Sequence, residues 1–249
     1  SVEPGQRATI PLTLTVSKDA ANALDDQTAL KILYDISGTP WRGTIPVPLN
    51  VASLITPDIT AKADFVIDKR ENIHNVCENV PATAQLTWKG PEDVSAKVRL
   101  GKSPDAVVLN VDVVDDAHHQ PFKDAFVWKG DNVQFALQVP NQVGRWEVGL
   151  SRLADGSAQT HCWVRPKGFD DPSGKITLTT EKTEHGVTYQ AKLPFKAFGL
   201  SDAILAKGIK FNLVVNDNDG ELREGWAQIA PGIADRKDTK PYPFLVFEQ

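Results

Sequence analysis

The chain has 249 residues, of which 41% are hydrophobic and 24% are charged. These values are close to those of ordinary globular domains, so the composition excludes disordered, collagen-like and low-complexity chains. Lys and Arg total 27 against 32 Asp and Glu, which gives a net charge of −5. Because no basic run accompanies this mildly acidic balance, a nucleic-acid-binding protein is not indicated.

Neither a membrane span nor an intact signal peptide is expected. The longest apolar runs are only a few residues, far short of the roughly 20 that cross a bilayer. The first five residues, SVEPG, lack the charged and apolar regions of a signal peptide. Since the chain contains no Met at all, we interpret it as an excised or processed piece, from which an export signal could have been removed.

Apolar and polar residues alternate with a period of two in several runs, and this pattern predicts β-strands with one buried and one solvated face. In chain order these runs cover residues 10–16, 44–49, 107–114, 133–139 and 187–193. Turn sequences such as Asp155-Gly156 separate the runs, and the helical candidates near residues 19–24 and 195–205 are short. Many short strands with little helix predict an all-β fold, an antiparallel β-sandwich.

A boundary between two parts of the chain is predicted near residues 50–60. The run at residues 45–51 contains two prolines, which is typical of an edge or terminal strand because proline cannot donate to a β-ladder. Thr56-Pro57-Asp58 then has the composition of a linker. Residues 60–249 are predicted to form the main sandwich. Residues 1–55 are interpreted as a partial immunoglobulin-like β segment, or as a small sandwich packed on the main one.

No catalytic signature supports an enzyme. The sequence lacks G-x-S-x-G and H-E-x-x-H motifs, and no Glu in an apolar strand stands out as a glycosidase acid, although paired carboxylates remain open among 32 acids. His118-His119 is interpreted as part of a solvated loop rather than a metal site. Cys77 and Cys162 cannot form a structural zinc site alone; two buried thiols or one disulfide both fit.

Two acidic clusters are candidates for a structural Ca²⁺ ion. Asn216-Asp217-Asn218-Asp219-Gly220 places side-chain oxygens on a tight turn, and Asp115-Asp116 ends a predicted strand. Oxygen donors of this kind suit calcium, although the EF-hand spacing and its terminal Glu are missing. The alternatives are an ordinary hairpin turn and solvated acids. The metal candidates are Asp115, Asp116, Asp217 and Asp219.

Tryptophan is the other notable residue type. Six tryptophans are present: Trp41, Trp88, Trp128, Trp146, Trp163 and Trp226. Trp is seldom fully buried because of its size and its N–H group. Most are expected to be ordinary core residues, but some could form a flat surface on which the apolar face of a sugar ring stacks.

Residues 60–249 resemble carbohydrate-binding module family 9. Four segments carry the resemblance: residues 107–116, the sequence WKGDNVQF from Trp128, the sequence GVTYQAKLPF from Gly186, and the sequence KFNLVVNDNDG from Lys210. Their order and spacing match the family as well. The resemblance implies a β-sandwich appended to bacterial polysaccharide-degrading enzymes, and it does not cover the first 55 residues.

The resemblance also implies a sugar site, with two departures from the family. Trp128 matches the family's stacking tryptophan, whereas the position of the second tryptophan is held by Ile229, and Trp226 lies three residues earlier, on the opposite face of a regular strand. The family's acidic ligand residue matches Gln134. We therefore expect Trp128 to stack on a sugar ring and Asn132 and Gln134 to hydrogen-bond its hydroxyls. Either Trp146 or Trp226 is expected to form the second wall.

The function predicted from the resemblance is that of a non-catalytic carbohydrate-binding module in a secreted or cell-surface bacterial protein active on polysaccharides. Its expected partner is a polysaccharide or oligosaccharide, and it is expected to be a monomeric module of a larger protein. The alternative is a structural spacer with the same fold and no ligand. A haem-binding relative is a third alternative, although zero Met excludes Met–His ligation. Implied export favours a disulfide, which requires Cys77 and Cys162 to lie close together.

Overall fold

The computed structural model describes residues 29–35, 42–48, 52–59, 62–78, 87–220 and 222–248. The chain divides into two compact units, Ser1–Val51 and Ala52–Gln249. In the first unit, β1 (Ala29–Asp35) and β2 (Arg42–Pro48) pair as an antiparallel hairpin. The predicted run at residues 10–16, the helical candidate near 19–24 and Trp41 lie outside the described residues, and the immunoglobulin-like interpretation stays a prediction.

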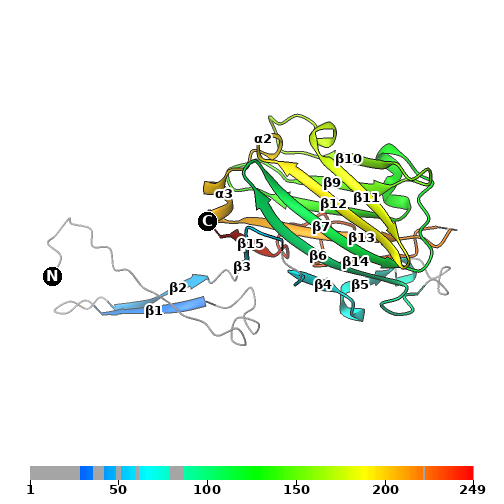
Figure 1. Ribbon diagram of the computed structural model, residues 1–249. Helices are drawn as coiled ribbons and strands as arrows, with labels where there is room; N and C mark the ends of the chain where they lie inside the picture. The colour runs from blue at the N-terminus through cyan, green and yellow to red at the C-terminus, as the bar shows by residue number, and fades with distance from the viewer. Residues whose placement is uncertain are drawn as a thin grey trace. The chain divides into compact units, whose positions relative to one another are not determined.

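The second unit is a sandwich of two β-sheets, whose layers are visible in Figure 1. The eight-stranded sheet contains β3 (Ala52–Ile55), β5 (Ile73–Asn75), β8 (Asn132–Gln138), β9 (Trp146–Arg152), β10 (Ala158–Val164), β13 (Ile209–Asp217), β14 (Gly225–Gln228) and β15 (Phe244–Phe247). Its main strand order is β10-β9-β8-β13-β14-β5, and β15 pairs with both β13 and β3.

The five-stranded sheet forms the other layer. It contains β4 (Phe65–Ile67), β6 (Val94–Ser103), β7 (Ala106–Asp115), β11 (Thr177–Thr183) and β12 (Gly186–Pro194), in the order β11-β12-β7-β6-β4. All described pairings in both sheets are antiparallel except that of β3 with β15. The predicted all-β, antiparallel sandwich is confirmed for this unit.

Helices are short, as the sequence predicted. The segments are η1 (Arg70–Asn72), η2 (Val76–Glu78), η4 (Asp124–Lys129), η5 (Ser173–Lys175), α2 (Phe195–Phe198) and α3 (Asp202–Lys207). Between α2 and α3, Gly199 adopts a left-handed conformation with φ of 61°, which ends the first helix because this conformation favours glycine. Among the described residues, no helix has both the length and the apolar character needed to cross a membrane.

The boundary between the two units lies after Val51, within the predicted range of residues 50–60 but before the predicted linker at Thr56-Pro57-Asp58. Residues 52–55 were expected to belong to the N-terminal segment, but they form β3, which pairs in parallel with β15 of the eight-stranded sheet. Ile55 is fully buried in the core of that unit. The pairing of β3 with the C-terminal strand, which no local sequence pattern indicates, assigns these residues to the second unit.

The core lies between the two sheets. On β7 and β12 the alternating apolar residues point into one large cluster, and the residues between them are exposed or half-buried. These core residues are Val107, Leu109, Val111, Val113, Val187, Tyr189, Ala191 and Leu193. The predicted alternation is therefore confirmed on both strands, and the outer face of the five-stranded sheet is solvated.

The outer face of the eight-stranded sheet differs, because it carries polar side chains that are nevertheless buried. On β8, Val133 and Phe135 point into the core as expected, but Gln134, expected on a solvated face, is also buried. The same is true of Glu147 on β9 and Asn216 on β13. Polar side chains rarely occupy buried positions without a structural or functional reason. These buried polar side chains therefore indicate a functional site on this covered face.

The predicted proximity of the two cysteines is wrong. Cys77 follows β5 and Cys162 lies on β10, and these strands are at opposite ends of the strand order, with β14, β13, β8 and β9 between them. Five interstrand spacings of about 4.8 Å give a separation of roughly 24 Å, whereas a disulfide needs Cα atoms within about 7 Å. Both are free thiols.

The two thiols are expected to differ in reactivity. Burial raises the pKa of Cys162 to about 11, and its Sγ donates to the carbonyl of Val164 at 3.2 Å, so little reactive thiolate forms near neutral pH. Cys77 is only partly buried. With a thiol reagent on the native protein, Cys77 should react first and Cys162 only after unfolding. Finding no free thiol in the unreduced, unfolded protein would contradict this assignment.

Candidate functional site

A pocket opens on the outer face of the eight-stranded sheet. Its volume is about 370 Å³, which is within the range of small-ligand sites. Two tryptophans and four polar side chains take part in the lining. The lining residues are Ala125, Trp128, Gln134, Glu147, Trp163, Val164, Arg223, Ala234 and Lys237.

The floor of the pocket is a hydrogen-bonded polar group on β8 and β9. Gln134 Nε2 donates to Glu147 Oε1 at 2.7 Å, and Arg145 Nη2 lies 3.1 Å from Glu147 Oε2. Lys237 Nζ, from the loop that precedes β15, also bonds Glu147 Oε1. Both oxygens of this buried carboxylate are therefore occupied, and two cations compensate its charge. The arrangement fixes the floor and leaves Gln134 Oε1 free of the bond to Glu147.

One wall is the short helix η4, which carries Trp128. Its position is fixed by Gln120, whose buried Nε2 donates to the carbonyls of Val127 and Asp131 at 2.8 and 2.9 Å. The sequence predicted Trp128 at the entrance of a strand, and it lies in this helix just before β8. Its side chain remains 39% exposed. The indole therefore offers an accessible apolar face at the pocket.

The other aromatic wall is Trp163, near the end of β10. A register shift between Cys162 and Val164 interrupts the pairing of β10 with β9, and such a bulge re-aims side chains. As a result, both Trp163 and Val164 line the pocket. Trp163 Nε1 donates to the carbonyl of Ala125 at 2.9 Å, which ties this wall to η4.

Trp163 needs the glycine beneath it. A Cβ atom built on Gly149 of β9 would lie 2.5 Å from Cη2 of Trp163. That distance is too short for any real contact, so only glycine lets the indole lie directly on the sheet.

Arg223, in the loop before β14, completes the pocket. Its guanidinium carbon lies 5.7 Å from the ring centroid of Trp128 and 4.3 Å from that of Trp226, which is the geometry of cation–π contacts. Trp226 in turn stacks on His74, with ring centroids 4.2 Å apart. Burial lowers the pKa of Arg223 to about 10, opposed by the negative charge of Asp217, so the side chain is still a cation at neutral pH.

The predicted sugar-site residues are only partly brought together. Trp128 and Gln134 line the pocket, whereas Asn132 is buried, accepts from Asn216 Nδ2 at 2.6 Å and is not part of the lining. Trp146 is fully buried in the core, with its indole N–H on Gln142. A side chain with no exposed face cannot stack on a ligand, so Trp146 is not a second wall. Trp226 lies on the outer face, but it contacts Arg223 and is not among the residues that line the pocket.

Four residues of the pocket were missed by the sequence reasoning: Glu147, Trp163, Arg223 and Lys237. One local signal existed, since Glu147 stands between the apolar residues Trp146 and Val148 in a strand-like run. The others come from a bulge and two loops, whose side-chain directions do not follow a strand period.

The metal candidates come together at one end of the sandwich. Asp115 ends β7, Asp217 ends β13, and Asp116 and Asp219 follow them. Around these lie Asp93, Asp131 and His118, and together they make three overlapping groups whose ligand atoms lie within 4.8 Å of one another. We call this set the acidic cluster; its members are Asp93, Asp115, Asp116, His118, Asp131, Asp217 and Asp219.

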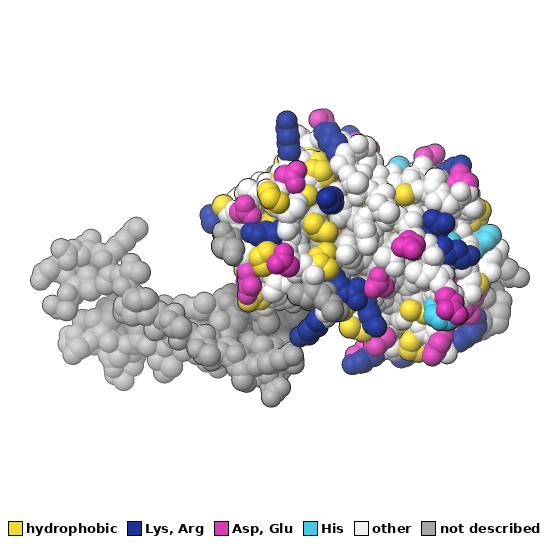
Figure 2. Space-filling view, viewed as in Figure 1, with side chains coloured by type: hydrophobic (Ala, Val, Ile, Leu, Met, Phe, Trp, Pro, Cys, Tyr) yellow, Lys and Arg dark blue, Asp and Glu magenta, His cyan; other side chains and the backbone are white. Residues whose placement is uncertain are grey.

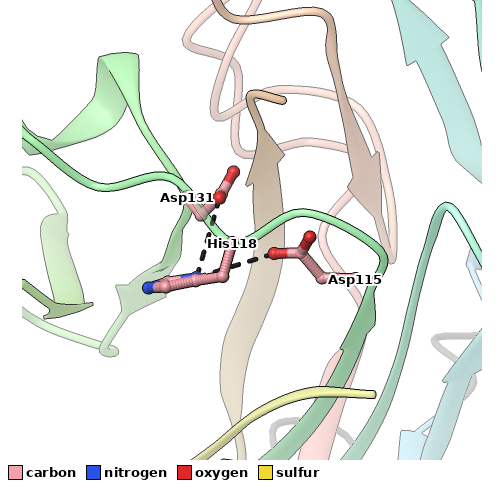
Figure 3. Close-up of side chains that lie close together, drawn as sticks. All are labelled: Asp115, His118 and Asp131. Carbon is pink, nitrogen blue, oxygen red and sulfur yellow. Dashed lines mark ion pairs between the residues drawn. The ribbon is translucent and has the colours of Figure 1, made fainter. Parts of the chain in front are cut away.

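His118 belongs to this cluster, contrary to the expectation of a solvated loop. Figure 3 shows its imidazole between two carboxylates, with Nδ1 at 3.6 Å from both Asp115 Oδ2 and Asp131 Oδ2. Nε2 lies 3.1 Å from the carbonyl of Arg152, which can only accept, so Nε2 carries the hydrogen. Only one-tenth of the side chain is exposed. The return of the loop onto β9 is what buries it.

Lys89 Nζ lies 3.3 Å from both Asp93 Oδ1 and Asp219 Oδ2, but this one cation does not balance the carboxylates of the cluster. Burial, followed by repulsion from Asp93 and Asp219, raises the pKa of Asp217 to about 8. Burial and the charge of Asp115 raise the pKa of Asp131 well above its usual range. Asp219 Oδ1 is buried without a partner among the described residues. The cluster offers mainly carboxylate oxygens, it is negatively charged, and one of its oxygens lacks a hydrogen-bond partner in the part of the chain that the structure describes. Such a set of donors fits a hard divalent ion such as Ca²⁺.

Comparison with known proteins supports the fold. The sequence matches no protein-family model and no curated protein. A carbohydrate-binding module family 9 from Caldicellulosiruptor kristjanssonii, in complex with cellotriose, aligns with a TM-score of 0.53 and 12% identity. The alignment covers 78% of this chain and 92% of that one. The second unit therefore has the fold of family 9 modules, and the predicted resemblance is confirmed at that level.

Two further structures align less well. One is a family 9 module from the same organism in complex with glucose, with a TM-score of 0.49 and 11% identity over 65% of this chain and 78% of that one. The other is a candidate carbohydrate-binding protein from Bacteroides uniformis ATCC 8492, with a TM-score of 0.49 and 12% identity over 79% of this chain and 99% of that one.

Proposed function

We propose that this protein is a non-catalytic carbohydrate-binding module that holds a sugar in the pocket between Trp128 and Trp163. The observation that carries the proposal is an exposed indole beside a buried polar floor, within one pocket of the sheet's outer face. The C–H face of a pyranose is apolar and matches a flat indole, while its hydroxyls need hydrogen-bonding groups in fixed positions. Trp128 supplies the flat indole, and Gln134 and Lys237 supply the hydrogen-bonding groups.

The alternative of a structural spacer with no ligand is less well supported. A spacer gives no reason for an indole 39% exposed at a pocket, nor for a buried carboxylate bound to two cations beneath it. Buried polar groups reduce stability unless they are well paired. Their presence on the covered face is more readily explained by ligand recognition.

The proposal includes an extracellular or cell-surface role in a bacterial protein active on polysaccharides. Its support is the fold shared with a family 9 module. On the face in Figure 2, Lys and Arg side chains are interspersed with Asp and Glu, so nothing in this view suggests a nucleic-acid partner.

The direct test is affinity electrophoresis of the whole chain through gels that contain soluble plant, algal or mucin polysaccharides. Retardation is expected on at least one of them, and calorimetry with oligosaccharides of that polymer should give a saturable isotherm. If no polymer retards the chain while its melting curve shows a folded protein, the spacer alternative replaces this proposal.

Gly149→Ala should weaken glycan binding without unfolding the protein. The added Cβ atom would overlap Trp163, so the indole must shift away from the sheet and narrow the pocket. We expect roughly a tenfold loss of affinity, about 1.4 kcal/mol, measured by calorimetry. Gly174→Ala is the matched control, because nothing lies within 4 Å of a Cβ atom at that position. Equal affinity of the two variants would show that Trp163 takes no part in binding.

We also propose that the acidic cluster holds a structural Ca²⁺ ion. Asp219 belongs to two of the three ligand groups and Asp115 to two, so a bound ion would join the ends of β7 and β13, which belong to different sheets. Its positive charge would remove the repulsion that raises the pKa of Asp217. The role of the ion is stability of the fold, since the sugar pocket contains none of these ligands.

A further inference from the structure

The charge balance of the sugar pocket is opposite to that of the chain. The chain has a net charge of −5, yet Glu147, the one acid in the described pocket lining, is bound by both Arg145 and Lys237, and Arg223 lines the same pocket. Arg145 and Lys237 bind the two oxygens of Glu147, so these three side chains together carry one excess positive charge. Arg223 adds a second. Such a surplus attracts anions, whereas a neutral sugar does not need it.

Arg223 is the unpaired member of this group. Within the described part of the chain it forms no ion pair, and its Nε is buried without a hydrogen-bond partner. A buried guanidinium with unused donors is costly unless another group binds it. The cation is also positioned by aromatic rings, because its guanidinium carbon lies over the rings of both Trp226 and Trp128, at 4.3 and 5.7 Å from their centroids. The residue is part of the pocket lining and so lies next to the space that a ligand would occupy.

Lys237 also places a positive charge at the pocket. This residue has a positive φ of 54°, which is uncommon outside glycine and is maintained only when surrounding contacts impose it. The contact that holds it is the ion pair with buried Glu147. About half of the Lys237 side chain is exposed, so its ammonium remains accessible from the pocket. The loop is thus held in a strained conformation that keeps a second cation at the site.

We propose that the pocket recognises a glycan whose bound sugar carries a carboxylate, a hexuronate, with Arg223 as the residue that binds this carboxylate. The inference rests on the proposed sugar-binding function. A planar guanidinium matches a carboxylate with two parallel hydrogen bonds. Because the guanidinium carbon of Arg223 lies 5.7 Å from the ring centroid of Trp128, a sugar that contacts this indole has its substituents within reach of the guanidinium. Lys237 contributes a second, less directional attraction.

The test compares acidic polymers with their own carboxyl-reduced forms. Polygalacturonate, alginate and hyaluronan are each used with the reduced polymer, which has the same backbone and no uronate charge, and dextran sulfate is a fourth probe. We expect one uronate polymer to bind the whole chain about 10- to 100-fold more tightly than its reduced form. This preference should weaken as salt is added.

Variants locate the preference. Arg223→Gln should bind the acidic polymer and its reduced form with equal affinity, and Arg223→Lys should retain part of the preference because it keeps the charge without the planar fork. Lys97→Gln is the control, since Lys97 is an exposed cation on β6 of the other sheet. This substitution removes one positive charge, as Arg223→Gln does. If Arg223→Gln does not fold, the comparison of native and reduced polymers on the original protein still tests the preference for hexuronate, and Arg223→Lys still tests the role of Arg223.

The outcomes separate the two proposals. Binding of a neutral glycan, with no uronate polymer preferred over its reduced form, overturns the hexuronate assignment and leaves the carbohydrate-binding function standing. Preference for dextran sulfate over every uronate polymer also overturns it. A preference for uronate that survives Arg223→Gln overturns the role of Arg223. If no polymer binds at all, both proposals are wrong.

Discussion

Replacing Trp128 with Ala should abolish glycan binding and leave the fold intact. The indole is the accessible aromatic face of the pocket, and tryptophans in such positions typically contribute 2 kcal/mol or more to binding, a loss of about 30-fold. Retardation in the affinity gel should disappear. The melting temperature should change little, because the side chain is 39% exposed and does not belong to the core.

Phe126→Ala is the matched control for Trp128→Ala. Phe126 lies in the same helix η4, is 58% exposed and does not line the pocket. Both aromatic rings lie near the ammonium of Lys129, so any general effect of losing an aromatic ring from η4 affects both variants. Binding that survives in Phe126→Ala but not in Trp128→Ala identifies the pocket. Unfolding of Trp128→Ala would instead show a structural role and favour the spacer alternative.

Much of the sandwich follows from local sequence pattern. The strands β7 and β12 lie where the period-two runs predicted them, and their apolar residues point to one core. The alternation is reliable there because the five-stranded sheet has one buried and one solvated face. The break between α2 and α3 also follows from a local feature, the glycine at position 199.

The pattern misleads on the eight-stranded sheet because both of its faces are covered. Gln134 alternates with core residues as a solvated side chain would, yet η4 and the loop before β15 cover it. Trp146 was also expected at the sugar site. Adjacent residues of a strand point to opposite faces, so Trp146 faces the core because its neighbour Glu147 faces the pocket. The number of tryptophans in the sequence does not show which of them lie on the pocket side.

The rest of the pocket depends on tertiary structure. Trp163 reaches the site through a register shift that no residue type announces, and Arg223 does so through cation–π contact with the neighbouring Trp226 and with Trp128, which is distant in sequence. The acidic cluster could be predicted from the sequence only in part. Its strand-end acids were recognisable one segment at a time, but their meeting with Asp131 and His118 follows from how the strands of two sheets end together.

Removing calcium should lower the melting temperature, and more so at higher pH. An ion present at 100 times its dissociation constant adds about 2.7 kcal/mol to the stability of the folded state, roughly 5–10 °C for a chain of this size. Melting is measured with excess Ca²⁺ and with a chelator. A midpoint that does not differ between the two conditions would exclude a bound ion.

The pH dependence follows from Asp217. In the ion-free protein its pKa is raised to about 8, so above about pH 4 the folded state holds a proton that the unfolded state has released. Stability without the ion therefore falls as the pH rises from about 4 to about 8. Calcium binds the deprotonated carboxylates, so the difference between calcium and chelator should be larger near pH 8 than near pH 5.

Asp219→Asn separates an ion effect from simple charge repulsion. Asp219 is shared by two of the ligand groups, so the variant should lose most of the rise in melting temperature that calcium produces. Without calcium the same variant should melt at nearly the same temperature as the original protein, because it loses one of the mutually repelling carboxylates but also the ion pair between Asp219 and Lys89 at 3.3 Å. Glu181→Gln, which removes an exposed acid from β11, should leave the calcium response unchanged. A full calcium response in Asp219→Asn would place the ion elsewhere.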